Sequence, residues 1–158
     1  MKIFLKLIKM TVLVCCIFFF VHQFSGPVDS TRDFLYVSEK IEQRIDLDTM
    51  TLQDNMGIKR FLMLEPEQYE KILYYKSTDT MQADEIVLVQ FKDKSQHILF
   101  KDTLQKHIQD QMRLFQGYAP AEEDKCKNAI IDIRANYALY VVSADAQKID
   151  RSFQKALQ

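Results

Sequence analysis

The chain has 158 residues, of which 47% are hydrophobic and 27% charged, with only 3 glycines and 3 prolines. This is the composition of one globular domain with a short appendage, and it excludes a second enzyme module or a long disordered linker. Three of the 21 lysines and arginines lie in the first nine positions, so the rest of the chain carries 18 basic and 22 acidic residues, which disfavours nucleic acid and anionic lipid as main ligands.

An apolar segment near the N-terminus predicts a membrane anchor. Residues 10–21 are apolar apart from one threonine, three lysines come before them, and the first acidic residue is Asp29. The uninterrupted run is short for a span, which needs about 20 residues. Lysine side chains can extend to the headgroups, however, and this lengthens the span. We therefore expect a transmembrane signal anchor over residues 4–24, in contact with membrane lipid.

The same pattern is typical of a cleaved secretory signal peptide. Gln23 and Phe24 stand where a signal peptidase requires small side chains. This favours an uncleaved anchor, with a cleaved signal peptide and a buried helix of a soluble protein as alternatives.

The charges on either side of the apolar segment predict its orientation. Basic residues precede it, whereas Asp29 and Asp33 follow it, so the short basic end over residues 1–9 should stay in the cytoplasm. We expect a short linker over residues 25–30 and an extracytoplasmic domain over residues 31–158. The protein would then be a single-pass protein of the cell membrane.

The domain is expected to begin with an amphipathic helix. Apolar residues recur there at three- and four-residue steps: Phe34, Val37, Ile41 and Ile45. A second short helix is expected from Asp48 to Gly57, because glycine suits the left-handed conformation after a helix end. Residues 58–68 are interpreted as a connection.

Two β-hairpins, each followed by a helix, are expected in the rest of the chain. β-Branched and aromatic residues predict strands over residues 72–75 and 85–91, and then over 129–134 and 137–143. In the second hairpin Ala135 and Asn136 form the turn, with asparagine tolerating positive φ.

Helical periodicity follows each hairpin. It runs from Ser95 to Gly117, a short helix begins at Pro120, and a final helix begins at Asp145. The ββα-ββα order predicts an α+β fold with a four-stranded antiparallel sheet packed by helices.

Three stretches together carry a resemblance to a known family: residues 81–89, residues 104–120 and residues 136–149. In order and spacing they resemble the family of the domain of unknown function 4358, found in membrane-anchored and lipoprotein-like proteins of Gram-positive bacteria. The resemblance covers about residues 31–157. It implies location and fold more than activity, and its context implies a role in cell-envelope polysaccharide modification. His107 departs from the arginine expected in the family, which implies that a salt bridge or anion contact of relatives is missing here.

No known catalytic or metal-binding motif is found. His97 and His107 are ten residues apart, about 15 Å along a helix, which is too far to share a metal. Cys126 is interpreted as a small, semi-buried residue. Ser152 and Lys155 have the spacing of the penicillin-recognising serine enzymes but lack their other motifs. We expect no metal and no cofactor, and we assign no catalytic residue.

Four residues in predicted turns form the candidate interaction surface: Tyr118, Pro120, Asn136 and Tyr137. Each turn could keep a polar tip exposed to a partner, although all four could serve only to shape the turns. The leading hypothesis is a non-enzymatic accessory module that contacts another membrane or envelope protein, since no nucleophile, base and orienting group converge in the sequence.

Two alternatives remain at this point. One is a ligand-binding domain for an envelope saccharide or small metabolite, in which Tyr74, Tyr75 and Tyr140 would stack on the ligand. The other is an enzyme of unrecognised type, which requires Cys126, His107 and carboxylates to converge in space.

Overall fold

The structure, a computed structural model, describes residues 10, 12, 14–15 and 29–158. Most of the predicted anchor over residues 4–24 and of the linker over residues 25–30 therefore lies outside the described residues. Among the described residues, no helix has both the length and the apolar character needed to cross a membrane.

The centre of the domain is an antiparallel sheet of five strands in the order β1-β2-β3-β5-β4. The strands are β1 (Met50–Leu52), β2 (Lys71–Ser77), β3 (Glu85–Gln90), β4 (Ile130–Arg134) and β5 (Tyr137–Val142). The predicted α+β class is confirmed, but the prediction of four strands is wrong. The additional strand β1 has only three residues, too few to show an alternating pattern, and it exists because it pairs with the end of β2.

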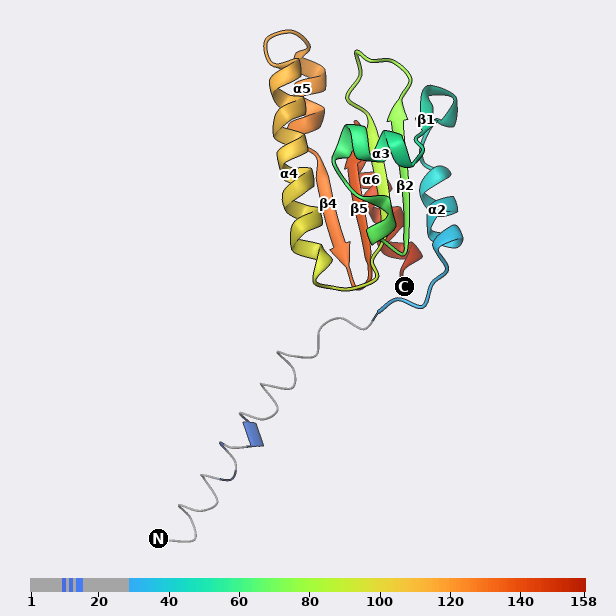
Figure 1. Ribbon diagram of the computed structural model, residues 1–158, viewed down its shortest axis with the longest axis vertical. Helices are drawn as coiled ribbons and strands as arrows, with labels where there is room; N and C mark the ends of the chain where they lie inside the picture. The colour runs from blue at the N-terminus through green and yellow to red at the C-terminus, as the bar shows by residue number, and fades with distance from the viewer. Residues whose placement is uncertain (1–9, 11, 13, 16–28) are drawn as a thin grey trace.

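Helices cover both faces of this sheet. They are α2 (Phe34–Glu42), α3 (Asn55–Leu62), α4 (Gln96–Phe115), α5 (Pro120–Lys127) and α6 (Ala146–Ala156), with short 3-10 helices η1 (Leu47–Thr49) and η2 (Pro66–Gln68). One face packs against α3, α4 and α5, and the other packs against α2 and α6 (Figure 1). The C-terminal Gln158 and Asp29 lie at the same end of the domain, where both line one pocket.

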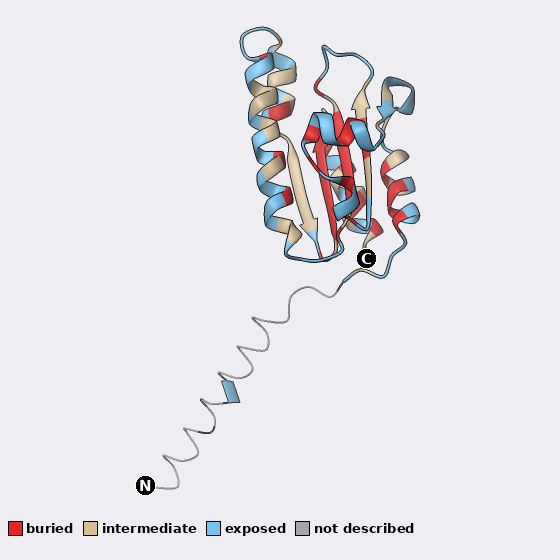
Figure 2. Ribbon diagram, in the orientation of Figure 1, coloured by how far each residue is buried: buried red, intermediate tan, exposed pale blue. Residues whose placement is uncertain are grey.

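The two predicted hairpins and the helix after each are confirmed. Their inner strands β3 and β5 pair along their whole length at the centre of the sheet, where both are buried (Figure 2). Continuous apolar runs are typical of strands covered on both faces. In the second turn, however, the positive φ of 53° belongs to Ala135 rather than to Asn136.

The predicted helix from Asp48 to Gly57 is wrong. The segment forms η1 and β1, and α3 then begins at Asn55. The Asp54 carboxylate caps α3 by accepting a hydrogen bond of 2.7 Å from the Gly57 N–H. Gly57 therefore lies in a first helical turn, and the left-handed residue that ends the helix is Met63, with φ of 55°.

Candidate functional site

A buried carboxylate, Glu85, is the most unusual feature of the core. It is the first residue of β3, its exposed fraction is 1%, and it faces the layer of α4. One oxygen, Oε1, accepts hydrogen bonds from the Tyr74 hydroxyl at 2.9 Å and from Lys76 Nζ at 2.8 Å, both on the neighbouring strand β2. Burial without such donors would be costly for a carboxylate.

The second oxygen of Glu85 is bound by donors from two other elements. Oε2 lies 2.6 Å from Nε2 of His107 on α4 and accepts a hydrogen bond of 3.3 Å from the Tyr140 hydroxyl on β5. We call Glu85 and its four partners, Tyr74, Lys76, His107 and Tyr140, the Glu85 cluster. The expectation that His107 lacks an anion contact is wrong, since it makes one with Glu85.

The ionisation of this cluster follows from its contacts. Burial disfavours the charged form of Glu85, but the hydrogen bonds and positive charges of His107 and Lys76 outweigh it, so the pKa of Glu85 is lowered. Burial, reinforced by the Glu85 charge, raises the pKa values of Tyr74 and Tyr140 far above the ordinary phenol value. Both phenols therefore remain protonated hydrogen-bond donors.

Cys126 lies in the same layer of the core and is fully buried. Burial, followed by the charge of Glu85, raises the pKa of its thiol to about 11. A thiolate is the form that attacks substrates, so Cys126 is a poor nucleophile. Cys126, His107 and a carboxylate do gather in one region, but the arrangement does not activate the thiol.

The Glu85 cluster is largely buried and its members bond to one another. The Glu85 oxygens are occupied by groups of the same cluster, and His107 has a side-chain exposure of 10%. No cluster residue lines any of four surface pockets on the described part of the chain, although Asp84 and Ile86, on either side of Glu85 in the sequence, line one of about 240 Å³. The cluster ties β2, β3 and β5 to α4. Glu85, a charged residue directly before the apolar run 86–89, was a signal in the sequence that could have pointed to it.

Asn136 and Tyr137 make contacts within the domain. The Asn136 side chain accepts a hydrogen bond of 2.8 Å from the Ser30 N–H and donates one of 3.3 Å to the Ser30 carbonyl. The buried Tyr137 hydroxyl donates to the Arg32 carbonyl at 2.8 Å, and its ring stacks on Phe34. These two residues hold the segment that leads into α2.

Tyr118 and Pro120 lie at the opposite end of the domain and are exposed. The Tyr118 side chain is 59% exposed, and its hydroxyl donates to Met81 Sδ at 2.8 Å. Pro120 is the first residue of α5, the position where proline suits a helix. Of the four predicted surface residues, these two share one end, and the other two lie at the far end.

Two further apolar side chains accompany Tyr118 there. Met81, in the loop between β2 and β3, is 50% exposed, and Leu114, near the end of α4, is 69% exposed. We call Met81, Leu114 and Tyr118 the distal patch. The sequence pattern alone did not single out Met81 or Leu114, because scattered exposed apolar residues are common.

Polar contacts fix the loop that carries Met81. The Ala83 N–H donates to a Glu122 carboxylate oxygen of α5 at 2.8 Å. Lys125 Nζ bridges Asp84 at 2.6 Å and the same Glu122 oxygen at 3.0 Å. These contacts hold the loop against α5, so the Met81 part of the distal patch is fixed before any partner binds.

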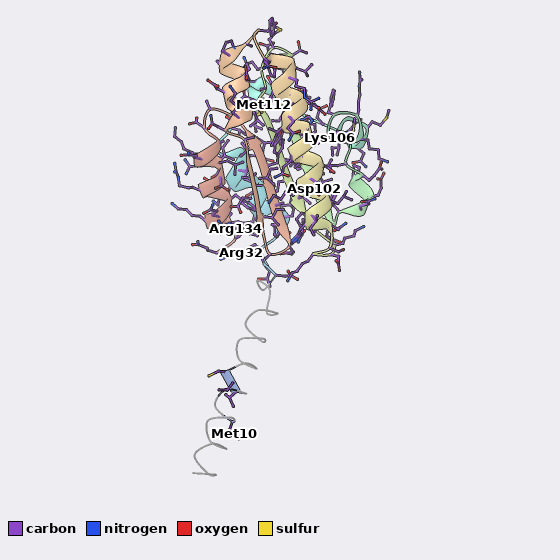
Figure 3. The ribbon with its side chains drawn as sticks, turned by 90° about the vertical axis from the view of Figure 1, so that its left-hand side faces the viewer. Met10, Arg32, Asp102, Lys106, Met112 and Arg134 are labelled. Carbon is purple, nitrogen blue, oxygen red and sulfur yellow. The ribbon has the colours of Figure 1, made fainter. Side chains whose placement is uncertain are left out.

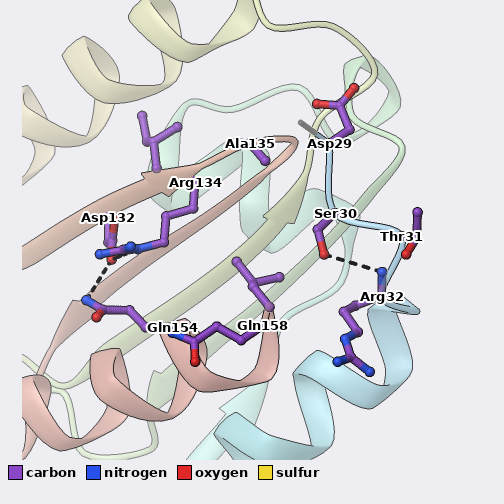
Figure 4. Close-up of a pocket in the computed structure, with 11 residues that line it drawn as sticks. Asp29, Ser30, Thr31, Arg32, Asp132, Arg134, Ala135, Gln154 and Gln158 are labelled. Atoms are coloured by element: carbon purple, nitrogen blue, oxygen red, sulfur yellow. Dashed lines mark hydrogen bonds and ion pairs between the residues drawn. The ribbon is translucent and has the colours of Figure 1, made fainter. Parts of the chain in front are cut away.

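A pocket of about 790 Å³ lies at the other end, between residues 29–32, β4 and α6 (Figure 4). Asp132 accepts hydrogen bonds there from Arg134 Nε at 2.7 Å and from Gln154 Nε2 at 3.0 Å. Gln154 also donates to Asp150 at 2.8 Å. Burial, and then the neighbouring Asp132, raise the pKa of Asp150 to about 6.

The predicted tyrosine platform is not exposed. Tyr74 and Tyr140 have no exposed surface, and Tyr75 is 9% exposed. No tyrosine lines the 790 Å³ pocket. Within the described part of the chain, no group of three or more histidine, cysteine, aspartate and glutamate side chains is arranged to hold a metal ion.

Comparison with known proteins gives one match. The family model described as a domain of unknown function, DUF4358, matches residues 43–143. No curated protein matches the chain, and no solved structure matches it.

Proposed function

This chain belongs to the family of the domain of unknown function 4358, and we propose that it is a membrane-anchored, extracytoplasmic accessory module that binds another membrane or envelope protein. The apolar residues 10–21, with three lysines before them and acidic residues after them, support an anchor over residues 4–24 and its orientation. Tethering would raise the effective concentration of the domain near a membrane-bound partner. Cell-envelope polysaccharide modification is the process in which we place it.

The distal patch carries this proposal. Its three apolar side chains are each at least half exposed, and they include a methionine and a tyrosine, which are types enriched at protein interfaces. Because the loop of Met81 is held by Glu122 and Lys125, little conformational entropy would be lost on binding. Exposed apolar groups on a rigid support favour a protein partner.

The chemistry of the core supports a binding role over an enzymatic one. The groups most suited to acid–base or nucleophilic work are Glu85, His107 and Cys126. The first two are bound to each other, and the thiol of the third stays protonated. A general base must reach the proton that it removes from a substrate, and buried paired groups do not.

Site-directed photo-crosslinking in intact cells tests the partner. A photo-reactive residue replaces the exposed Gln116, which leaves the distal patch intact. We expect a discrete adduct with one envelope protein, and its loss when Met81 and Leu114 are both changed to glutamate. The matched control is Leu99→Glu, the same change at a residue 62% exposed near the other end of α4, which should leave the adduct unchanged.

Two results would contradict the proposal. The first is an adduct that persists in the Met81→Glu/Leu114→Glu variant, or the absence of any adduct from position 116. Either observation would show that the distal patch is not the binding surface. The second is full-length protein in the soluble fraction of cells lysed without detergent, which would show that residues 4–24 do not anchor the chain in a membrane.

A further inference from the structure

One end of the domain has to lie close to the membrane when residues 4–24 anchor the chain. Only residues 25–28 separate this anchor from Asp29, the first residue of the domain that the structure describes. Even a fully extended chain spans at most about 18 Å from residue 24 to Asp29. A folded domain is about 30 Å across and would not fit into that gap. The end of the domain that carries Asp29 therefore faces the bilayer, with no room for a folded partner between them.

Contacts within the domain identify what else lies at this end. Asp29 and residues 90–94 line one surface cavity. The loop of residues 90–94 leads into α4, and α2 begins shortly after Asp29, so both helices begin at the Asp29 end (Figure 1). In Figure 3, Asp102 of α4 lies on the side of Arg32, and Met112 lies toward the opposite end of the domain.

Four apolar side chains in the first turns of these two helices are exposed. Leu35 and Tyr36 of α2 are 64% and 41% exposed, and Ile98 and Leu99 of α4 are 73% and 62% exposed. Because α2 and α4 cover opposite faces of the sheet, the two pairs flank the point where Asp29 enters the domain. Side chains of a helix lean toward its N-terminus, which directs all four toward the membrane side. We call these four residues the proximal rim.

Tyr36 has the surroundings of an aromatic residue at a membrane interface. The Arg32 guanidinium lies 5.8 Å from the centroid of its ring, and Lys40 Nζ lies 5.4 Å from it. Tyrosine is enriched where a membrane meets water, because its ring is apolar and its hydroxyl is polar. Long basic side chains beside it can cover apolar surface with their stems and keep their charges among the headgroups.

The charges at this end do not select the lipid. Lys94 pairs with Asp29 at 3.2 Å, and Lys71 pairs with Asp33 at 3.8 Å. The domain as a whole has more acidic than basic residues, which disfavours attraction to anionic headgroups. The apolar side chains of the proximal rim are therefore the groups that favour the bilayer.

We infer that the proximal rim seats the domain on the outer leaflet of the membrane that holds its anchor, with its side chains at the boundary between headgroups and acyl chains. The occupant is lipid, because the short tether leaves no room there for a folded protein. This contact rests on the proposed anchor and deepens the proposed function. Leu114 lies 15 residues after Leu99 on α4, so the distal patch would stand about 22 Å farther from the bilayer. Its partner must extend outside the membrane by that distance.

Fluorescence quenching by nitroxide-labelled lipids tests this contact. The chain has no tryptophan, so a single introduced tryptophan reports on its own position. The full chain is reconstituted into phosphatidylcholine vesicles with a nitroxide on the headgroup or upper acyl chain, and flotation first shows that the chain is bound. We expect strong quenching and a shift of the emission to shorter wavelength in Leu99→Trp, because an interfacial side chain lies about 5–10 Å into the headgroup region. Leu114→Trp, on the same helix and 69% exposed, is the matched control and should show neither change.

Charge substitutions show whether the apolar side chains hold the contact. In the Leu99→Trp background, Leu35→Glu/Ile98→Glu should abolish most of the quenching while the chain still floats with the vesicles, since a carboxylate is costly to remove from water. Leu52→Glu/Met56→Glu introduces the same charges on β1 and α3, at residues 55% and 78% exposed. This second pair should leave the quenching unchanged.

Three outcomes would overturn the inference: no quenching or equal quenching at positions 99 and 114, quenching that requires an anionic lipid such as phosphatidylglycerol, and an emission shift that grows with protein density without quenching. The last would identify a second copy as the occupant. A chain that does not float would overturn the anchor and this inference together, whereas a floating chain without quenching leaves the anchor and the distal patch standing. Leu99→Glu alone leaves the anchor and the other three residues of the proximal rim in place, so the crosslink at Gln116 stays a separate test.

Discussion

Replacing Glu85 by alanine should destabilise the domain strongly, because four donors lose their common acceptor. Lys76 at 2.8 Å and His107 at 2.6 Å would lose their carboxylate, and the hydroxyls of Tyr74 and Tyr140 would lose their only acceptor among the described residues. None of these groups is well exposed. Lys76 has a side-chain exposure of 20% and His107 of 10%.

The size of the effect follows from these contacts. Removing one partner of a buried ion pair costs about 3–5 kcal/mol, and each buried hydroxyl left without a partner costs about 1–3 kcal/mol. Lys76 lies near the surface and regains water, which reduces the sum. We expect a loss of at least about 4 kcal/mol in the free energy of unfolding, a large part of the roughly 5–15 kcal/mol typical of a domain.

Denaturant unfolding of the full chain in detergent micelles, followed by circular dichroism, measures this loss. The pKa of Glu85 is lowered from an ordinary value of 4.5, so its stabilising effect is fully present above that value and is lost as the pH falls through the lower native pKa. The difference between wild type and Glu85→Ala should therefore shrink below about pH 4.5.

The control is Glu65→Ala, which removes an exposed ion pair with Lys59 and should change the stability by less than about 1 kcal/mol. A loss below about 1 kcal/mol for Glu85→Ala, or a difference that does not change with pH, would refute the account of the cluster.

Three other variants or measurements test separate parts of the structure. Burial and Asp132 raise the pKa of Asp150 from 3.8 to about 6, so ionisation destabilises the fold as the pH rises through this range. Asp150→Asn should therefore raise the free energy of unfolding at pH 8 by about 1 kcal/mol after solvent screening, and should not raise it at pH 3. Equal effects at both pH values in denaturant unfolding would contradict this. The Cys126 thiol, with a pKa of about 11, should react with a maleimide at pH 7 only after unfolding, which mass spectrometry detects. Tyr137→Phe removes the hydrogen bond to the Arg32 carbonyl and should cost about 1 kcal/mol in denaturant unfolding, with the core packing kept.

The candidate site could be predicted only in part. Tyr118 and Pro120 are exposed at one end of the domain, as the turn between two helices suggested. Asn136 and Tyr137 carry the same kind of local pattern, yet they bind Ser30 and Arg32, more than a hundred positions earlier in the chain. A turn motif shows that a polar side chain is available for hydrogen bonding, but it does not show which distant segment that side chain will contact.

The sequence by itself determined the elements whose signal is local. Both hairpins follow from runs of β-branched and aromatic residues, and the helices α4 and α6 follow from a periodicity of 3.6 residues; the α+β class and the family resemblance came with them. Only the tertiary structure decided the pairing of β2 with β1 and the burial of Glu85. Each depends on which segments meet in space: β1 is too short to fold without β2, and a buried carboxylate is stable only where distant donors surround it.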